Sequence, residues 1–379
     1  MIGGGMHSFM GAIHRAAIEK AGLRLACGVF GSTRQSSYDS AREYGLSGDA
    51  VMGQYRDILR RQGRLKGDAK ALFATVLAPN VLHYPVTMAA MDNGLGVLCE
   101  KPFTCTLDEA LNLARKQRAL GLPYRIAMVY PAYSQLVKAR KLIRDGALGT
   151  LRRFDVCLQQ GWMARRVENQ GVRSAMWRTE KAHSGKGGVI TEMSCHCQFA
   201  LEWVTGLEIE SVCAVAKAVV PGRMVADDAA VFVKTASAPA GVFRMSTVAV
   251  GHTEGLSFEI TGDAAAMFWR QDRPGELRIV ENDGTERILK DRSLSGEGES
   301  ALVPFGANAA YVEALSRVYS DFRDEINGTT KKIRKSGERI LGMTIEEGVR
   351  SVAVAEAIER SAAETDGASK WVQVERTGI

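Results

Sequence analysis

The stretch that decides the fold is Gly3-Gly4-Gly5-Met6-His7-Ser8-Phe9-Met10-Gly11, which leads directly into an amphipathic helical pattern. Glycines at positions 3 and 5 allow the backbone to turn tightly and to approach a pyrophosphate closely. The start of the following helix supplies N–H donors and the positive end of the helix dipole. The segment predicts a dinucleotide-binding turn, in which Ser8 is the third small residue and Gly11 lengthens the usual spacing.

The strand that should lead into this turn is short, because only Met1 and Ile2 precede Gly3. The central strand of such a sheet needs about five residues. We therefore expect further residues of this strand ahead of Met1 in the natural protein.

Apolar runs alternate with helical patterns as far as residue 130. This alternation predicts a parallel sheet with right-handed crossovers. The expected strands are 24–29, 71–77, 96–99 and 124–129, and the expected helices are 11–20, 37–44, 54–62, 81–93 and 107–120.

The pattern changes beyond residue 132. Consecutive strand-like runs joined by short turns predict a mostly antiparallel sheet. The expected strands are 151–159, 209–219, 229–236, 240–250, 256–261, 266–270, 276–280 and 286–289. The expected helices are 133–145, 189–204, 308–326 and 345–364, with a polar connection over 327–339.

Composition excludes several classes of protein. The 379 residues include 49 basic and 43 acidic ones, which are interspersed, so the net charge of +6 is no nucleic-acid signature. No apolar run approaches the roughly 18 residues that span a membrane. The seven cysteines are odd in number and irregularly spaced, which favours reduced thiols in the cytoplasm. Cys195-His196-Cys197 lacks a second ligand pair at zinc-site spacing, so we expect no metal.

The end of the second expected strand bears on cofactor choice. Enzymes that use NAD usually carry an acidic residue here for the ribose hydroxyls. This chain has Ser32, Thr33 and Arg34 instead. These side chains would suit the 2′-phosphate of NADP(H), whereas backbone groups alone would suit NAD(H), and both cofactors stay open.

Several motifs together resemble the Gfo/Idh/MocA oxidoreductase family, which includes glucose-fructose oxidoreductase and inositol dehydrogenase. After the glycine turn come Ala78-Pro79-Asn80 with His83, then Cys99-Glu100-Lys101-Pro102. Farther on, Trp177-Arg178, Ser184-Gly185-Lys186-Gly187-Gly188, His196 and a tail near Trp371-Val372 also match the family pattern. The resemblance covers essentially the whole chain.

This resemblance implies an α/β fold with three regions. Residues 1–130 are expected to form an NAD(P)-binding Rossmann domain. Residues 131–345 would form a substrate-binding and oligomerisation domain with a large, mostly antiparallel open sheet. Residues 346–379 would form a C-terminal helix and tail that pack back towards the Rossmann domain.

The resemblance also implies roles for individual residues. Lys101 would lie beside the nicotinamide and stabilise charge on the reacting oxygen. His196 would be the acid/base, and Glu192, four residues earlier on the same helical face, stands where the family usually has Asp. Glu192 would orient His196 or bind a substrate hydroxyl, or it would only cap or pair locally. The expected cofactor-binding residues are Gly3, Gly5, Ser8, Phe9, Met10, Ser32, Thr33, Arg34, Ala78, Pro79, Asn80, His83, Glu100, Lys101, Trp177 and Arg178.

The pocket departs from the family pattern in two further places. Met128-Val129-Tyr130 and Gly306-Ala307-Asn308-Ala309-Ala310-Tyr311 replace more polar segments. Tyr130, Trp162, Trp177 and Tyr311, with Arg178, would form an aromatic-walled substrate site, or the Trp residues are simply core.

Three functions remain open on this basis. The first is a dehydrogenase acting on a secondary alcohol of a sugar, polyol or glycoside. The second is a redox-neutral NAD-dependent glycosidase or lyase that passes through a transient 3-keto sugar. The third is a non-catalytic nucleotide-binding regulator. The large sheet face favours a homodimer or homotetramer, and neither a nucleic acid nor a membrane is expected as a partner.

Overall fold

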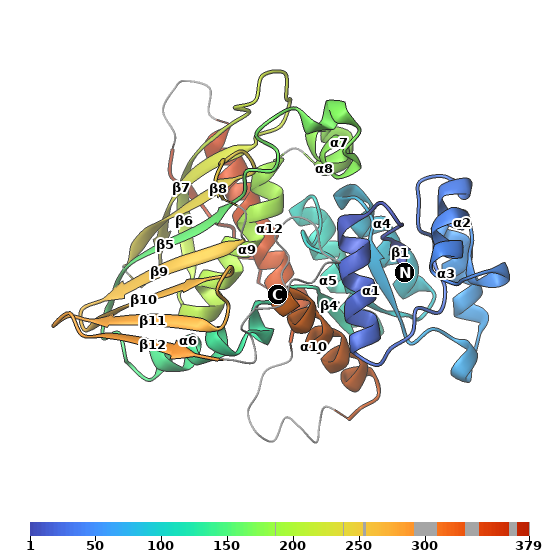
Figure 1. Ribbon diagram of the computed structural model, residues 1–379, viewed down its shortest axis with the longest axis horizontal. Helices are drawn as coiled ribbons and strands as arrows, with labels where there is room; N and C mark the ends of the chain where they lie inside the picture. Colours follow the sequence, from blue (N-terminus) through green and yellow to red (C-terminus); the bar gives the residue numbers. More distant parts are fainter. Residues whose placement is uncertain are drawn as a thin grey trace. The chain divides into compact units, whose positions relative to one another are not determined.

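The computed structural model describes residues 1–185, 187–237, 239–252, 255–291, 309–329, 341–363 and 370–378 (Figure 1). The chain divides into two compact units. The first unit contains Met1–Val129 and Tyr311–Val349, and the second contains Tyr130–Ala310 and Arg350–Gly378. The expected domain bounds, 1–130, 131–345 and 346–379, stay a prediction.

The first unit is built on a four-stranded parallel sheet in the order β1-β2-β3-β4. All four residues of β3 are buried, as is usual for a parallel strand that is covered on both faces. The strands are β1 (Ile2–Gly3), β2 (Phe73–Leu77), β3 (Gly96–Cys99) and β4 (Tyr124–Ile126). The helices are α1 (Phe9–Lys20), α2 (Arg34–Glu43), α3 (Tyr55–Arg64), α4 (His83–Asp92), α5 (Leu107–Leu120) and, from Tyr311 onward, α10 (Ala309–Ile326).

The expected strand at 24–29 is wrong, because only isolated bridges form there. Val29 bridges Ile2, and Gly28 bridges Val51. The physical reason is that β1 contains only Ile2 and Gly3, too few residues to pair along 24–29, and residues 24–27 line a pocket together with Phe73, Ala74 and Thr75.

The second unit is built on a nine-stranded sheet in the order β12-β11-β10-β9-β5-β8-β7-β6-β13. Every neighbouring pair is antiparallel except β5 and β8, which run parallel from Arg153↔Ala240 to Gln159↔Ser246. The prediction of a large, mostly antiparallel sheet is therefore confirmed. The strands are β5 (Leu151–Gln159), β6 (Ile209–Lys217), β7 (Asp228–Thr235), β8 (Ala240–Ser246), β9 (Leu256–Gly262), β10 (Ala265–Arg270), β11 (Glu276–Glu281), β12 (Glu286–Lys290) and β13 (Val372–Gln373).

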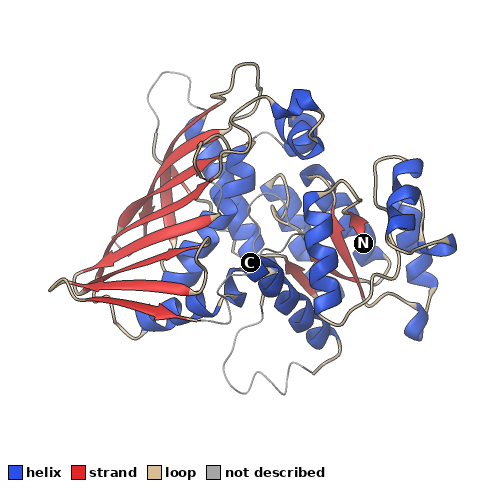
Figure 2. Ribbon diagram, viewed as in Figure 1, coloured by secondary structure: helices blue, strands red, loops and turns tan. Residues whose placement is uncertain are grey.

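Described helices of the second unit cover one face of this sheet (Figure 2). Helix α9 packs on β5, β6, β7 and β8, and α6 packs on α9 and β11. The helices of the second unit are α6 (Ser134–Arg144), α7 (Arg173–Thr179), α8 (Lys181–Ser184), α9 (Val189–Thr205) and, from Arg350 onward, α12 (Ile345–Ala362). The short α7 and α8 escape prediction because neither carries a long apolar stripe.

The C-terminal tail joins the sheet of the second unit. Val372 and Gln373 form β13 and pair antiparallel with Val212 and Ser211 of β6. Backbone pairing at the open edge of β6 holds the tail there. The expectation that residues 346–379 pack back towards the Rossmann domain stays a prediction.

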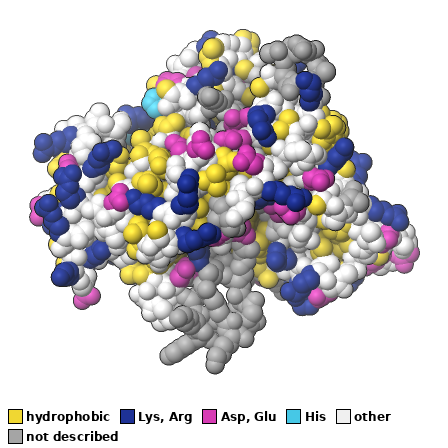
Figure 3. Space-filling view, turned by 180° about the vertical axis from the view of Figure 1, so that it is seen from behind, with side chains coloured by type: hydrophobic (Ala, Val, Ile, Leu, Met, Phe, Trp, Pro, Cys, Tyr) yellow, Lys and Arg dark blue, Asp and Glu magenta, His cyan; other side chains and the backbone are white. Residues whose placement is uncertain are grey.

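Further expectations concern the cysteines, membrane-spanning helices and the distribution of charge. The seven cysteines are all free. Among the described helices, none is both long and apolar enough to cross a bilayer. Basic and acidic side chains are interspersed over the face shown in Figure 3, as the sequence predicts. Residues 306–308 and most of the 327–339 connection lie outside the described residues.

Candidate active site

The glycine turn of the first unit is packed too closely for side chains. A Cβ atom at Gly3, where φ is +87°, would lie 2.5 Å from the Leu77 carbonyl carbon. One at Gly5 would lie 2.1 Å from the Phe30 oxygen. Ser8 caps the helix that follows, since its hydroxyl accepts a hydrogen bond from the Gly11 N–H at 3.1 Å. The turn thus ends at a capped helix N-terminus, with Phe9 and Met10 in the first helical turn, and this arrangement fits a pyrophosphate.

The residues expected near the cofactor's ribose lie at the start of α2. Ser32, Thr33 and Arg34 are all exposed. The Thr33 hydroxyl accepts a hydrogen bond from the Ser36 N–H at 3.1 Å and so caps the helix. The Arg34 guanidinium lies 5.4 Å from the centre of the Tyr38 ring. Thr33 therefore already has a structural role, and Arg34 is the cation that this loop offers.

The loops after β2 and β3 are joined through His83, the first residue of α4. Its Nδ1 lies 2.6 Å from the Pro102 carbonyl oxygen, and its Nε2 lies 2.9 Å from that of Ala78. Asn80, which follows Ala78 and Pro79, is buried. The two motifs that carry the family resemblance in this unit are thus in contact through one side chain.

Glu100 belongs to a buried hydrogen-bond chain. Its Oε1 lies 2.9 Å from Nε2 of His14, and His14 Nδ1 lies 2.6 Å from the Tyr319 hydroxyl, which donates to Thr75 Oγ1 at 3.4 Å. Burial alone would raise the pKa of Glu100, but the hydrogen bond from His14 and the positive charges of His14 and Lys101 lower it below its usual range. Glu100 therefore fixes the base of the loop, and Lys101, partly exposed, follows it directly.

Sequence reasoning assigned no role to His14 or Tyr319. The two residues are 305 positions apart, so no local pattern pairs them. The one available signal was a polar His14 on the otherwise apolar face of α1, where an unpaired histidine would be costly.

His196 and Tyr130 form a pair in the second unit. The Tyr130 hydroxyl lies 2.7 Å from His196 Nδ1, and the two rings meet edge to face at 5.6 Å. Tyr130 is only 1% exposed, so its position is fixed by packing. The hydroxyl therefore orients the imidazole of the expected acid/base.

Glu192 is held by Arg178. The Arg178 Nε donates to Glu192 Oε2 at 2.7 Å, and another guanidinium nitrogen donates to the Ser174 carbonyl oxygen at 2.7 Å. The guanidinium also lies over the Trp177 ring at 4.1 Å and near the Trp162 ring at 5.7 Å. The structure thus brings together four of the predicted residues, which are Trp162, Trp177, Arg178 and Glu192.

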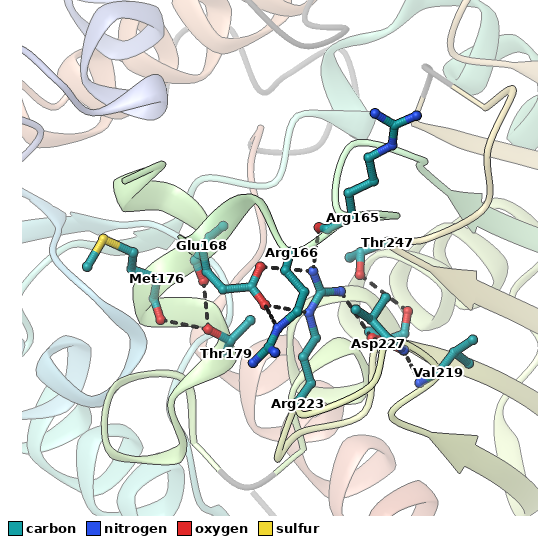
Figure 4. Close-up of polar contacts among 11 residues, drawn as sticks. Arg165, Arg166, Glu168, Met176, Thr179, Val219, Arg223, Asp227 and Thr247 are labelled. Carbon is teal, nitrogen blue, oxygen red and sulfur yellow. Dashed lines mark hydrogen bonds and ion pairs between the residues drawn. The ribbon is translucent and has the colours of Figure 1, made fainter. Parts of the chain in front are cut away.

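A second charged cluster in this unit, drawn in Figure 4, was not predicted. Arg223 donates to both carboxylate oxygens of Glu168, at 3.1 and 3.0 Å, to Asp227 Oδ2 at 3.1 Å and to the Arg165 carbonyl at 2.9 Å. Its side chain is 1% exposed. Burial would raise the pKa of Glu168, but the Arg223 guanidinium lowers it below its usual range. No sequence pattern marks this cluster, because Arg223 and Asp227 lie in a loop and Glu168 in a short 3-10 helix.

Both charged clusters border one small pocket. Arg178 and Glu192 line it together with Arg223 and Asp227. Hydroxyl side chains complete the polar lining, and these are Thr179, Ser184 and Thr247. A wall of charges and hydroxyls suits a ligand that carries several hydroxyl groups. Tyr311, expected in the same site, belongs to the first unit.

Comparison with known proteins identifies the family. Residues 1–127 match the model of the oxidoreductase family with an NAD-binding Rossmann fold, and residues 136–268 match the model of the GFO/IDH/MocA C-terminal domain. Together these matches cover more than two thirds of the chain. The chain belongs to the Gfo/Idh/MocA family of oxidoreductases.

Individual relatives agree with this assignment. The chain is 21% identical to the uncharacterized oxidoreductase YfiI of Bacillus subtilis over 98% of this chain and 95% of that protein. It is 24% identical to levoglucosan dehydrogenase of Pseudarthrobacter phenanthrenivorans over 79% of each chain. An inositol dehydrogenase homolog from Azotobacter vinelandii, solved with NAD⁺, superposes with a TM-score of 0.86 at 25% identity, over 98% of this chain and 96% of that one.

The class of the protein follows from the family and the fold. It is an oxidoreductase whose cofactor is a nicotinamide dinucleotide, bound by the Rossmann domain of the first unit.

Proposed function

We propose that this protein catalyses hydride transfer between the nicotinamide ring and a secondary alcohol of a sugar, polyol or glycoside. The observation that supports this most strongly is the polar pocket of the second unit, with charged pairs and hydroxyls around it. A polyhydroxylated ligand offers matching donors and acceptors to such a wall. The names of two relatives, levoglucosan dehydrogenase and inositol dehydrogenase homolog, agree with that class of substrate.

Lys101 and His196 would divide the handling of the hydroxyl proton. The Lys101 ammonium would donate a hydrogen bond to the substrate oxygen and stabilise negative charge that develops on it. His196, oriented by Tyr130, would accept the hydroxyl proton during oxidation and return it during reduction. The bound cofactor supplies the hydride acceptor or donor.

Arg178 and Glu192 would bind substrate hydroxyls rather than transfer protons. A carboxylate already paired with a guanidinium at 2.7 Å is a weak base but a good acceptor for a hydroxyl group. Trp162 and Trp177 would then give the apolar face of a sugar ring a flat surface to lie on.

Cofactor preference would depend on Arg34. No acidic side chain stands at positions 31 to 34, and Arg34 is exposed at the start of α2. We propose that NADP(H) is accepted alongside NAD(H), with Arg34 beside the 2′-phosphate.

A steady-state assay tests the proposed reaction. Nicotinamide absorbance is followed with NAD⁺ and NADP⁺ against a panel of sugars, polyols and aryl glycosides. The expected result is net reduction of the cofactor with at least one compound, and a loss of about 100-fold or more in kcat/KM for Lys101→Met and for His196→Ala. Lys138→Met, on the exposed face of α6, is the matched control.

Two outcomes would overturn the proposal. Product formation from a glycoside without any net change in absorbance would indicate the redox-neutral glycosidase or lyase. Tight cofactor binding with no turnover across the panel would indicate a nucleotide-binding regulator.

A further inference from the structure

We infer that His83 is an imidazolium at neutral pH that staples the loop after β2 to the loop after β3 and thereby positions Lys101. Its two ring nitrogens face two backbone carbonyl oxygens, those of Pro102 and Ala78. Ala78 precedes Pro79 and Asn80, and Pro102 directly follows Lys101. One side chain thus joins the two loops at the carboxyl ends of neighbouring strands. The protonation of His83 does not depend on the proposed function, and only its effect on the position of Lys101 rests on that function.

The hydrogen bonds themselves require the second proton. A neutral imidazole carries one N–H donor and one nitrogen lone pair. A carbonyl oxygen can only accept, so a neutral ring would leave one lone pair facing another across 2.6 or 2.9 Å. A doubly protonated ring donates to both carbonyls, and no rotation or tautomer of the neutral form does so.

The surroundings of the ring bear on whether a charge is tolerated there. His83 is 1% exposed, so burial acts against the charged form. The Cys99 side chain of β3 and the two carbonyls act in the opposite direction and raise the pKa of His83 to about 9. Glu100 also faces this charge, since a positive His83 contributes to lowering its pKa. Tyr124 of β4 lies beyond Cys99 and interacts with it.

The consequence for the site is positional. In open parallel sheets the cofactor binds at the carboxyl ends of the strands, where these two loops lie. Displacing a reacting side chain by about 1 Å can lower the reaction rate roughly 100-fold. The staple would hold the backbone on both sides of the cofactor-binding edge at a fixed separation, without touching substrate itself. His83 is thus a positioning residue.

Nitrogen-detected NMR of the histidine side chains in the full-length protein tests the protonation directly. We expect one imidazolium pattern to persist from pH 6 to about pH 9 and to disappear in His83→Gln and in His83→Asn. A neutral tautomer at position 83 at pH 7.5 would overturn the proposal. If one variant fails to fold, the other still assigns the signal to His83 and separates it from His14, whose charge faces Glu100.

Stability as a function of pH provides a second readout. Because the pKa of His83 is raised above its unfolded value of 6.5, the stabilisation is complete below about pH 6.5 and is lost as the pH rises through about 9. The denaturant midpoint of the wild type should therefore exceed that of His83→Gln most at pH 6 and converge with it near pH 10. A constant difference across this range would contradict a charged staple.

Kinetics separate this inference from the proposed function. With a substrate found by the panel, His83→Gln should lower kcat by about 10-fold to 100-fold while the KM of the alcohol changes little. His252→Gln, in an exposed turn, is the control and should match the wild type. If the wild type shows no turnover but the imidazolium persists, only the proposed function fails. If turnover is normal and the ring is neutral, only the staple fails.

Discussion

At the scale of single residues, the proposed acid/base, His196, is oriented by a contact that joins two distant parts of the chain. Tyr130 and His196 are 66 positions apart, yet the hydroxyl and Nδ1 lie 2.7 Å apart. The sequence predicted both residues for the site, but it assigned Tyr130 to the substrate wall. The motif around His196 predicts the histidine itself, but it does not predict which distant side chain will contact the imidazole ring.

Replacing Tyr130 by Phe removes this contact while keeping the ring. We expect kcat/KM for alcohol oxidation to fall by about 10-fold, because the imidazole loses the partner that fixes its orientation and tautomer. The KM for cofactor should not change. Tyr55→Phe in α3 is the control for loss of a phenol hydroxyl, and rates equal to the wild type in Tyr130→Phe would show that the contact has no role in proton transfer.

The surroundings of Glu192 could be predicted only in part from its spacing to His196. The four-residue separation placed it correctly on the same helix as His196, α9. Spacing gave no means of finding Arg178, which comes from the short helix α7 and pairs with the carboxylate. The charge state and role of a carboxylate depend on such partners, which only the folded chain supplies.

At the scale of elements, helices and strands with long apolar patterns were predicted well, and irregular segments were predicted poorly. Strands β3 and β5 and helix α5 begin and end at the predicted residues, because buried apolar runs and caps such as Thr106 and Gly121 mark them. Residues 163–188 gave no periodic signal. They nevertheless contain α7, α8 and five of the twelve residues that line the polar pocket, since ion pairs rather than an apolar stripe hold them.

The ion pairs of Arg223 with Glu168 and Asp227 should therefore keep this segment in its folded conformation. Arg223→Met leaves Glu168 and Asp227 buried without their cation, and we expect a loss of about 3 kcal/mol in the free energy of unfolding of the second unit. Limited trypsin digestion should cut faster at Arg165 and Arg166. Arg270→Met, which removes an exposed ion pair with Asp272, is the control and should cost less than about 1 kcal/mol. Equal losses in the two variants would show that the cluster is no more than a surface pair.

At the scale of the whole molecule, the face of the large sheet that the described helices leave uncovered favours self-association. Phe232 of β7 is 60% exposed and Val215 of β6 is 51% exposed on this face. Register places Phe232 between Cys213 and Val242, so apolar side chains form a continuous row. An apolar row on an open sheet is usually buried against a partner, and a second copy of this chain is the occupant we expect.

A charge in the middle of this row should separate the subunits. We expect light scattering to report a dimer or tetramer for the wild type and a monomer for Phe232→Asp, because a carboxylate would be buried without a partner. Val250→Asp introduces the same charge at an exposed position after β8 and should leave the assembly intact. A wild-type monomer at micromolar concentration would refute this arrangement.

The parallel pairing of β5 with β8 has a consequence for how the chain reaches its native state. About 80 residues separate the two strands, and α9, β6 and β7 lie between them in the chain. During synthesis β5 emerges long before either of its neighbours in the sheet, β8 and β9. Its apolar residues must stay unpaired until the intervening stretch has been synthesised and β8 has paired with β5. Pairing across such a long sequence separation raises the contact order and is slow. Refolding yield, and dependence on chaperones in the cell, should therefore be governed by the middle of the sheet rather than by its edges.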